Sequence, residues 1–172
     1  MSRTNQASKA AVNEMYFSLD ADTAALGPTI ADAFGTNSAI QTEQDAEYEI
    51  VFNIWYRKDT SGTVTWTVVN TQAFAAFDGF KLQSVAGGLA ANGSPTGMGL
   101  TNTTSASQAF AATASLTDTT NQYTEIRVKC RTAAAGNIRL RVTSSAGTVI
   151  LRRGSYFRVR RLPTTPLGAF VA

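Results

Sequence analysis

The chain has 172 residues, of which 44% are hydrophobic and 16% are charged, and its formal net charge is +3. This length suits one domain, or one domain with an arm, and the many threonine, serine, alanine, asparagine and glycine residues favour a β-rich structural protein over an enzyme. Histidine is absent and Cys130 is the only cysteine, which excludes Ser-His-Asp and Cys-His catalytic units, an H-E-x-x-H metal site, a cysteine-based zinc site and an internal disulfide.

The beginning of the chain predicts an arm followed by a short strand. Residues 1–14 are polar and small, without periodicity, and indicate a flexible N-terminal arm of the kind that anchors a module to something larger. The apolar run from Met15 to Leu19 predicts a first strand, whereas residues 24–34 are predicted to form a loop. Neither a signal peptide nor an apolar run of membrane-spanning length is recognisable, so we expect synthesis in a cytoplasm.

The strongest strand prediction covers residues 48–56, where alternation separates two faces. One face carries Tyr48, Ile50, Phe52, Ile54 and Tyr56. The other face carries Glu47, Glu49, Val51, Asn53 and Trp55. Residues 59–62 are predicted to form a hairpin turn, after which residues 63–68 return with Val64, Trp66 and Val68 facing inward.

The middle of the chain predicts a long loop and one further strand. Between Phe80 and Leu100 the glycines gather in a loop about fifteen residues long, a length that is often functional in compact domains. These glycines lack the strand-glycine-helix context of a phosphate-binding loop, so a crossing loop of a β-sandwich is the better interpretation. Alternation around Phe110 predicts that a strand lies within residues 107–116.

The end of the chain predicts a series of basic strands. In residues 125–131, Ile126, Val128 and Cys130 share one face, while Glu125, Arg127, Lys129 and Arg131 share the other. Residues 138–142 repeat this arrangement after a turn, residues 148–151 continue as a strand, and the last strand, residues 155–162, ends before Pro163. Hairpin pairing of the first two runs would place five basic residues on one surface: Arg127, Lys129, Arg131, Arg139 and Arg141.

Charge is unevenly distributed along the chain. Residues 1–60 hold nine acidic and four basic side chains, whereas residues 121–172 hold one acidic and ten basic ones. One interpretation is that the acidic segment from Glu43 to Glu49 pairs with the basic strands, within one subunit or between subunits. Another is that the basic face docks onto an acidic surface of a larger assembly. Nucleic-acid binding is disfavoured because no aromatic stacking platform or known nucleic-acid motif accompanies the arginines.

These patterns predict an all-β protein with a single antiparallel β-sandwich or jelly roll of about eight strands. We expect the arm at residues 1–14, the sandwich domain at 15–163 and a C-terminal tail at 164–172. The paired carboxylates Asp20 and Asp22, or Asp45 and Glu47, are best interpreted as solvated surface rather than a catalytic or calcium site. We therefore expect no enzyme activity, no cofactor and no metal.

Several segments together resemble the small jelly-roll modules of tailed-bacteriophage virion proteins. They are Ala46-Glu47-Tyr48, Trp66 on the following strand, Gly136-x-Ile-x-Leu, Gly147-Thr148-Val149 and the closing run Arg153-Gly154-Ser155-Tyr156-Phe157-Arg158-Val159-Arg160-Arg161-Leu162. The closing run is similar to the last strand of modules in tail-fibre, head-fibre and capsid-decoration proteins. The resemblance covers residues 15–163 and implies a homotrimeric jelly roll, similar to tumour necrosis factor or C1q, displayed on a phage particle.

Chain architecture favours a capsid decoration, or cement, protein within this group. A receptor-binding fibre normally carries a long stalk before its tip, whereas we expect only the arm at residues 1–14 before the sandwich domain. The expected partners are two further copies of the chain and the major capsid protein, and the expected location is the capsid exterior. The candidate capsid or subunit contacts are the basic residues Arg127, Lys129, Arg131, Arg139, Arg141, Arg158 and Arg160. The alternative is a tail- or head-fibre module that binds a host glycan or receptor, with Trp55 and Tyr56 as an aromatic platform for sugars. Alternation favours packing over this platform, because it points Tyr56 into the core and leaves Trp55 for a subunit interface.

The aromatic content provides an independent reason to expect oligomerisation. The chain has more phenylalanines than a sandwich of this size needs for its own core, and aromatic residues are enriched at subunit contacts. We predict that Trp55, Phe74 or Phe77 contributes to a three-fold interface.

Overall fold

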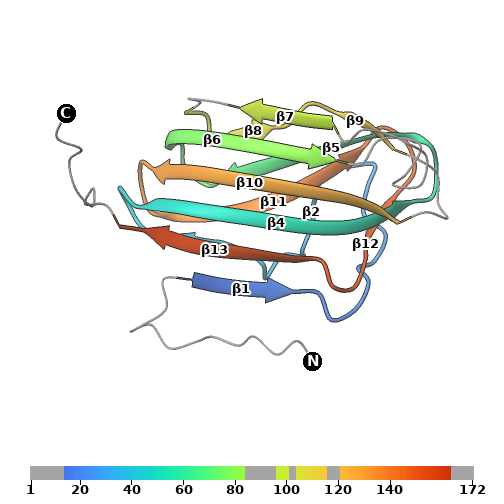
Figure 1. The fold of residues 1–172 in the computed structure, drawn as a ribbon, viewed down its shortest axis with the longest axis horizontal. Helices are drawn as coiled ribbons and strands as arrows, with labels where there is room; N and C mark the ends of the chain where they lie inside the picture. The colour runs from blue at the N-terminus through green and yellow to red at the C-terminus, as the bar shows by residue number, and fades with distance from the viewer. Residues whose placement is uncertain (1–13, 84–95, 101–103, 116–120, 164–172) are drawn as a thin grey trace, which may run out of the picture.

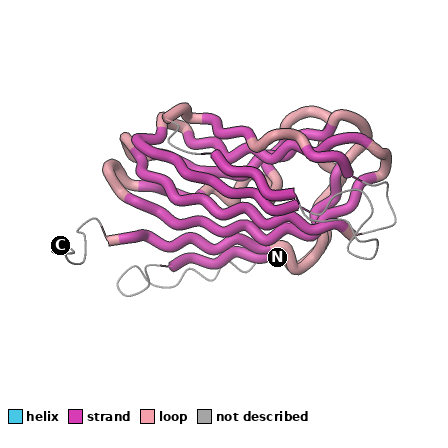
Figure 2. Tube along the Cα trace, turned by 45° about the horizontal axis from the view of Figure 1, so that its top comes forward, coloured by secondary structure: helices cyan, strands magenta, loops and turns pink. Residues whose placement is uncertain are grey.

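A computed structural model describes residues 14–83, 96–100, 104–115 and 121–163 (Figure 1). Every regular element in these ranges is a strand, and the strands form two antiparallel sheets packed face to face (Figure 2). The predicted all-β sandwich is therefore confirmed. Residues 1–13 and 164–172, which make up nearly all of the predicted arm and the whole predicted tail, lie outside the described residues.

The first sheet, called sheet A, has seven strands. Its hydrogen-bonded order is β1 (Glu14–Ser18), β13 (Tyr156–Leu162), β4 (Glu47–Lys58), β10 (Gln122–Thr132), β6 (Phe74–Gln83) and β7 (Thr96–Leu100), and β12 (Val149–Leu151) pairs with the end of β4. The strand predicted from Met15 is present as β1, which pairs with β13 at the edge of the sheet.

The second sheet, called sheet B, has six strands. Its order is β2 (Ala31–Asp32), β11 (Gly136–Ser144), β5 (Gly62–Asn70) and β8 (Ser107–Ala109), while β3 (Ile40–Thr42) pairs with β11 and β9 (Thr113–Ser115) pairs with β5. Residues 24–34, predicted as loop, contain β2 as well as a bridge between Leu26 and Val149.

Both predicted hairpins are wrong. Strand β4 pairs with β10, β12 and β13 in sheet A, whereas the next strand, β5, pairs with β11, β8 and β9 in sheet B. The same crossing separates β10 from β11. A short turn can join two strands of one sheet or carry the chain from one sheet to the other, and alternation along each strand is identical in the two cases.

The core lies between the inner faces of the two sheets, as the strand patterns predict. The inward residues of β4, from Tyr48 to Tyr56, are at most 5% exposed, and Val64, Trp66 and Val68 of β5 oppose them at 0%. Cys130 is buried on the inner face of β10, as predicted. These rows bury a continuous apolar layer, which is the main source of stability in a sandwich.

Gly79 of β6 makes room for two aromatic rings in this core. A Cβ atom at this position would lie 2.8 Å from Phe110 Cζ and 2.8 Å from Phe77 Cε1, closer than carbon atoms can pack. Phe110, at 1% exposure, therefore packs directly over the backbone of β6.

One end of the interior is polar instead of apolar. The Tyr56 hydroxyl donates to Gln122 Oε1 at 3.2 Å and accepts from Gln83 Nε2 at 2.8 Å. Sheet A contributes two fully buried lysines, Lys58 at the end of β4 and Lys81 on β6. Lys81 donates to the Ala111 carbonyl at 2.7 Å, and Lys58 donates to Ser144 Oγ and to the Ala146 carbonyl. Burial lowers the pKa of Lys58 and lowers that of Lys81 to about 8, since a low-dielectric interior disfavours the charged form.

Candidate interaction surfaces

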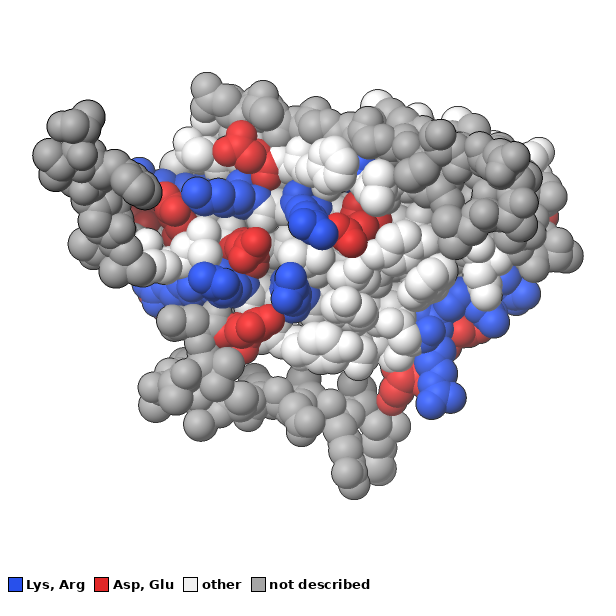
Figure 3. All heavy atoms as spheres, viewed as in Figure 1, with Lys and Arg blue, Asp and Glu red and all other residues white. Residues whose placement is uncertain are grey.

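The outer face of sheet A carries a row of charges that alternate in sign from strand to strand (Figure 3). The row, which we call the charge ladder, consists of Glu14, Arg160, Glu49, Lys129 and Asp78, one residue from each of β1, β13, β4, β10 and β6. Each member lies opposite a residue of the other sign on the neighbouring strand. Opposite charges facing each other across strands are mutually favourable. The three carboxylates and two cations of the ladder therefore nearly balance one another within the chain.

Further basic residues of the last strands also meet carboxylates of the same chain. Arg131 Nη2 lies 3.6 Å from Asp45 Oδ1, and Arg161 Nη1 lies 2.9 Å from Glu43 Oε2. Arg127 forms an ion pair with Glu125. The interpretation that the acidic segment pairs with the basic strands within one subunit is therefore confirmed, and the outer face of sheet A is not uniformly basic.

A hollow lies on the outer face of sheet A and is lined in part by residues of the charge ladder. Its lining residues are Glu14, Glu49, Val51, Arg158 and Arg160. Val51 forms the floor: it is only 5% exposed although it points outward, and its register partners are Arg127 and Arg158. Arg158 has no ion pair with another described residue.

An aromatic strip, defined by Tyr16, Trp55, Tyr123 and Tyr156, runs along the same outer face beyond the charges. The Trp55 and Tyr123 ring centroids are 4.7 Å apart, and those of Tyr16 and Tyr156 are 5.2 Å apart. Trp55 is 39% exposed and Tyr16 is 62% exposed. Much of this aromatic surface is therefore in contact with solvent in the single chain.

Hydrogen bonds hold the hydroxyl of Tyr123, one member of the aromatic strip, in place. The Tyr123 hydroxyl lies 2.5 Å from Asn53 Oδ1 and 3.1 Å from Glu125 Oε2. Burial and the Glu125 carboxylate raise the pKa of Tyr123 to about 12, so the hydroxyl stays protonated at neutral pH. The ring of Tyr123 is thus fixed beside Trp55.

Only one of the three predicted interface aromatics lies on this surface. Phe74 and Phe77 are 1% and 0% exposed and pack against each other with ring centroids 5.0 Å apart, inside the core. Their prediction as subunit contacts is wrong, because the core of one chain already encloses them. Sequence reasoning missed Tyr16, Tyr123 and Tyr156. Tyr123 could have been found, since alternation places it on the same face of its strand as Glu125.

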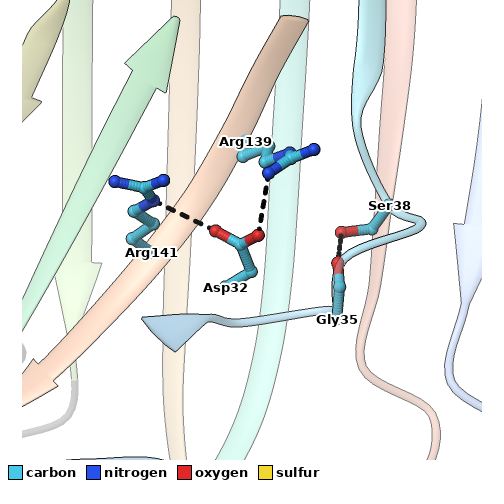
Figure 4. Close-up of polar contacts among 5 residues, drawn as sticks. All are labelled: Asp32, Gly35, Ser38, Arg139 and Arg141. Atoms are coloured by element: carbon cyan, nitrogen blue, oxygen red, sulfur yellow. Dashed lines mark hydrogen bonds and ion pairs between the residues drawn. The ribbon is translucent and has the colours of Figure 1, made fainter. Parts of the chain in front are cut away.

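The outer face of sheet B carries a separate cluster of charge (Figure 4). Arg139 Nη1 lies 3.1 Å from Asp32 Oδ2, and Arg141 Nε lies 3.0 Å from Asp32 Oδ1. The prediction that Arg139 and Arg141 share one surface with Arg127, Lys129 and Arg131 is therefore wrong, because β10 and β11 belong to different sheets. The seven predicted basic contacts divide between two opposite faces.

Within the described ranges, no group of three or more histidine, cysteine, aspartate and glutamate residues is arranged to hold a metal ion. No helix long and apolar enough to cross a membrane occurs there.

Burial raises the pKa of the Cys130 thiol to about 12, so the thiolate, which is the reactive form, is suppressed at neutral pH. Asp22 accepts a hydrogen bond from the Arg153 backbone N–H at 2.8 Å and forms an ion pair with Arg152.

No family model matches the chain, and no curated protein matches it significantly. The fold and the surfaces therefore define the class: a β-sandwich protein whose outer faces carry an aromatic strip with a charge ladder on one sheet and an arginine-carboxylate cluster on the other.

Proposed function

We propose that this protein is a structural component of a tailed-phage virion, a homotrimeric decoration protein that binds the outer capsid surface and stabilises the head. The observation that carries the proposal is the outer face of sheet A, where exposed aromatic side chains lie beside charges that face opposite charges on the neighbouring strands. Aromatic residues are enriched at protein interfaces because they bury large areas at little cost in conformational entropy.

The pairing of charges within the chain favours a second copy as the occupant of this face. A strongly basic surface would repel an identical copy, whereas the charge ladder presents alternating signs with little net charge. In the proposed trimer, Trp55 and Tyr123 are covered by a neighbouring subunit, and the sequence prediction for Trp55 is retained. We propose a trimer, and not another oligomer, because the closing strands resemble those of trimeric virion modules.

The order of strands supports a jelly roll within the β-sandwich class. Strands β1, β13, β4 and β10 lie side by side in sheet A, and β2, β11, β5 and β8 lie side by side in sheet B. Consecutive strands such as β4 and β5, or β10 and β11, belong to opposite sheets. Chain wrapping of this kind distinguishes a jelly roll from a meander of hairpins.

The proposed role requires no covalent chemistry. A protein that binds the assembled shell but not its separated subunits shifts the equilibrium away from disassembly by its binding free energy. The proposal therefore assigns no enzymatic function to this chain, and the buried, protonated Cys130 agrees with that assignment.

The direct test adds purified protein to expanded heads that lack it and then challenges the heads with heat or a chelator. The expected result is saturable binding and a higher temperature of DNA release or shell collapse than in undecorated heads. Absence of binding, or binding without any gain in head stability, contradicts the proposed function.

A second candidate is a tail- or head-fibre module that binds a host glycan. The observation that favours it is the exposed Trp55–Tyr123 pair beside the hydrogen-bonding groups of Asn53 and Glu125, since sugars stack on aromatic rings and bond to such groups. A glycan array that is positive for the wild-type protein and negative for a Trp55→Ala variant, together with immunogold label at tail tips, would favour this candidate over the first. Label over heads and a negative array would exclude it.

A further inference from the structure

The outer surface of sheet B carries one charged cluster, and the other residues in its described strands are uncharged. In the described strands of this sheet, the only charged residues are Asp32, Arg139 and Arg141. On β5, Val69 lies opposite Arg139 and Thr67 lies opposite Arg141. The next outward pair is Thr65 and Thr143. Two guanidinium groups and one carboxylate leave a net charge of about +1 at this cluster, which we call the arginine cluster.

Asp32 fixes both arginines without using all their donors. Arg141 bonds to Asp32 through Nε and Arg139 bonds through Nη1, so each guanidinium retains terminal N–H groups. In Figure 4 these terminal nitrogens project away from the carboxylate. Arg139 Nε is buried and has no hydrogen-bond partner among the described residues.

The cluster is partly shielded from water. The Asp32 side chain is 12% exposed, and those of Arg139 and Arg141 are 32% and 37% exposed. Partial burial strengthens electrostatic interactions relative to those in bulk water. Side chains that are already ordered in the free protein also lose less entropy when a partner binds.

We infer that the arginine cluster is the contact through which this protein binds an acidic side chain of the capsid protein; the inference rests on the proposed function. A carboxylate can accept two parallel N–H bonds from the spare donors of a guanidinium, which a lysine cannot offer. On sheet A, by contrast, Lys129 and Arg160 already lie between carboxylates of their own chain. Arg158 of sheet A has no such ion pair with a described residue, but it lies on the face that the proposed function gives to the neighbouring subunit. We therefore assign the capsid contact to sheet B and leave sheet A for the neighbouring subunit.

The test measures the affinity of three proteins for expanded heads that lack the protein. They are the wild type, an Arg139→Gln/Arg141→Gln variant, and a control, Arg57→Gln/Arg153→Gln, which removes the same charge from exposed arginines elsewhere. The Arg139→Gln/Arg141→Gln variant is expected to bind about tenfold or more weakly, because truncating one partner of a bonded charge pair is costly. The control is expected to stay within about threefold of wild type, as rim charges do.

The possible outcomes separate the two proposals. If the wild type does not bind heads, the proposed function is overturned and the inference with it. If the wild type binds and both variants bind equally well, or lose affinity equally, only the arginine cluster is overturned.

A second variant, Arg139→Lys/Arg141→Lys, retains the positive charges next to Asp32 and so is less prone to unfold than the glutamine variant. Far-ultraviolet circular dichroism and thermal melting check that each variant is folded. The lysine variant is expected to fold and still to bind more weakly than wild type, because the forked geometry is lost. Full affinity in this folded variant would overturn the inference.

Discussion

The side chain of Ser155 is hydrogen-bonded to both backbone groups of Trp55. Its hydroxyl accepts from the Trp55 N–H at 3.0 Å and donates to the Trp55 carbonyl at 3.0 Å. The contact lies in the break between β12 and β13, two strands that both pair with β4. Gly154, with a φ of +86°, turns the chain in this break. The Trp55 carbonyl also accepts from the Arg152 backbone N–H at 2.7 Å. The serine side chain thus supplies the acceptor for the Trp55 N–H and a second donor to its carbonyl, and it anchors the strand that presents Trp55.

Replacing Ser155 by alanine is expected to lower the free energy of unfolding by about 1–3 kcal/mol, because the Trp55 N–H would lose its partner in a buried position. Urea denaturation of the variant measures this loss. Ser18→Ala, an exposed serine at the end of β1, is the matched control and should change stability by less than about 0.5 kcal/mol. Equal effects at the two positions would show that the bonds to Trp55 contribute nothing.

Gly79→Ala is expected to destabilise the fold by about 1–3 kcal/mol, since the new methyl group would overlap the rings of Phe77 and Phe110. A second substitution, Phe110→Leu, removes part of the obstructing ring. The double variant should therefore lose less stability than the sum of the two single variants, which a double-mutant cycle from thermal denaturation measures. Strict additivity would contradict the packing of Phe110 over Gly79.

Asp32→Asn is expected to lower the free energy of unfolding by about 1–2 kcal/mol at low salt, because one carboxylate connects β2 to two arginines of β11. The loss should shrink at about 1 M salt, where screening weakens the wild-type ion pairs. Asp20→Asn, at an exposed carboxylate in the preceding loop, serves as the control. A loss that is the same at both salt concentrations would argue against an electrostatic origin.

The buried Lys81 predicts a dependence of stability on alkaline pH. Its pKa is lowered by burial from 10.5 to about 8. Below pH 8 both the folded and the unfolded chain carry the proton, and the cost of burying the charge is fully present. Between pH 8 and 10.5 the unfolded chain binds more protons than the folded chain, so this group makes the free energy of unfolding rise with pH, by about 3 kcal/mol at most.

Lys81→Met tests this relationship, because it removes the titrating group from a fully buried position. Unfolding curves at pH 7 and pH 10 should show that the variant lacks the alkaline gain contributed by Lys81. Lys129→Met, an exposed lysine in the charge ladder, is the control and should retain the gain. Parallel stability curves for wild type and Lys81→Met would contradict a lowered pKa at Lys81.

Alternation along single strands was sufficient to predict the sandwich class and the inward rows. It placed Ile50, Trp66 and Cys130 correctly, because side-chain direction in a strand depends only on parity. Alternation does not assign strands to sheets, so it wrongly predicts that Arg139 shares a surface with Arg127, although the two residues lie on opposite faces of the sandwich. Pairing between distant strands determines that grouping, and register is not encoded in any one segment.

Two further features depend on partners far away in sequence. The charge ladder joins Glu14 to Asp78 through three intervening strands, so no local pattern contains it. Lys58 and Lys81 stand at positions that alternation assigns to the core, yet a lysine at such a position ordinarily indicates a strand end or a solvated face. Their burial depends on acceptors supplied by other segments, such as the Ala146 and Ala111 carbonyls.

The mass of the protein in solution tests the central claim, that the outer face of sheet A binds another copy of the chain. Light scattering at micromolar concentration should give three times the 18.3 kDa of one chain for the wild type, and a smaller mass for a folded Trp55→Ala/Tyr123→Ala variant. A wild-type mass of one chain would contradict the claim.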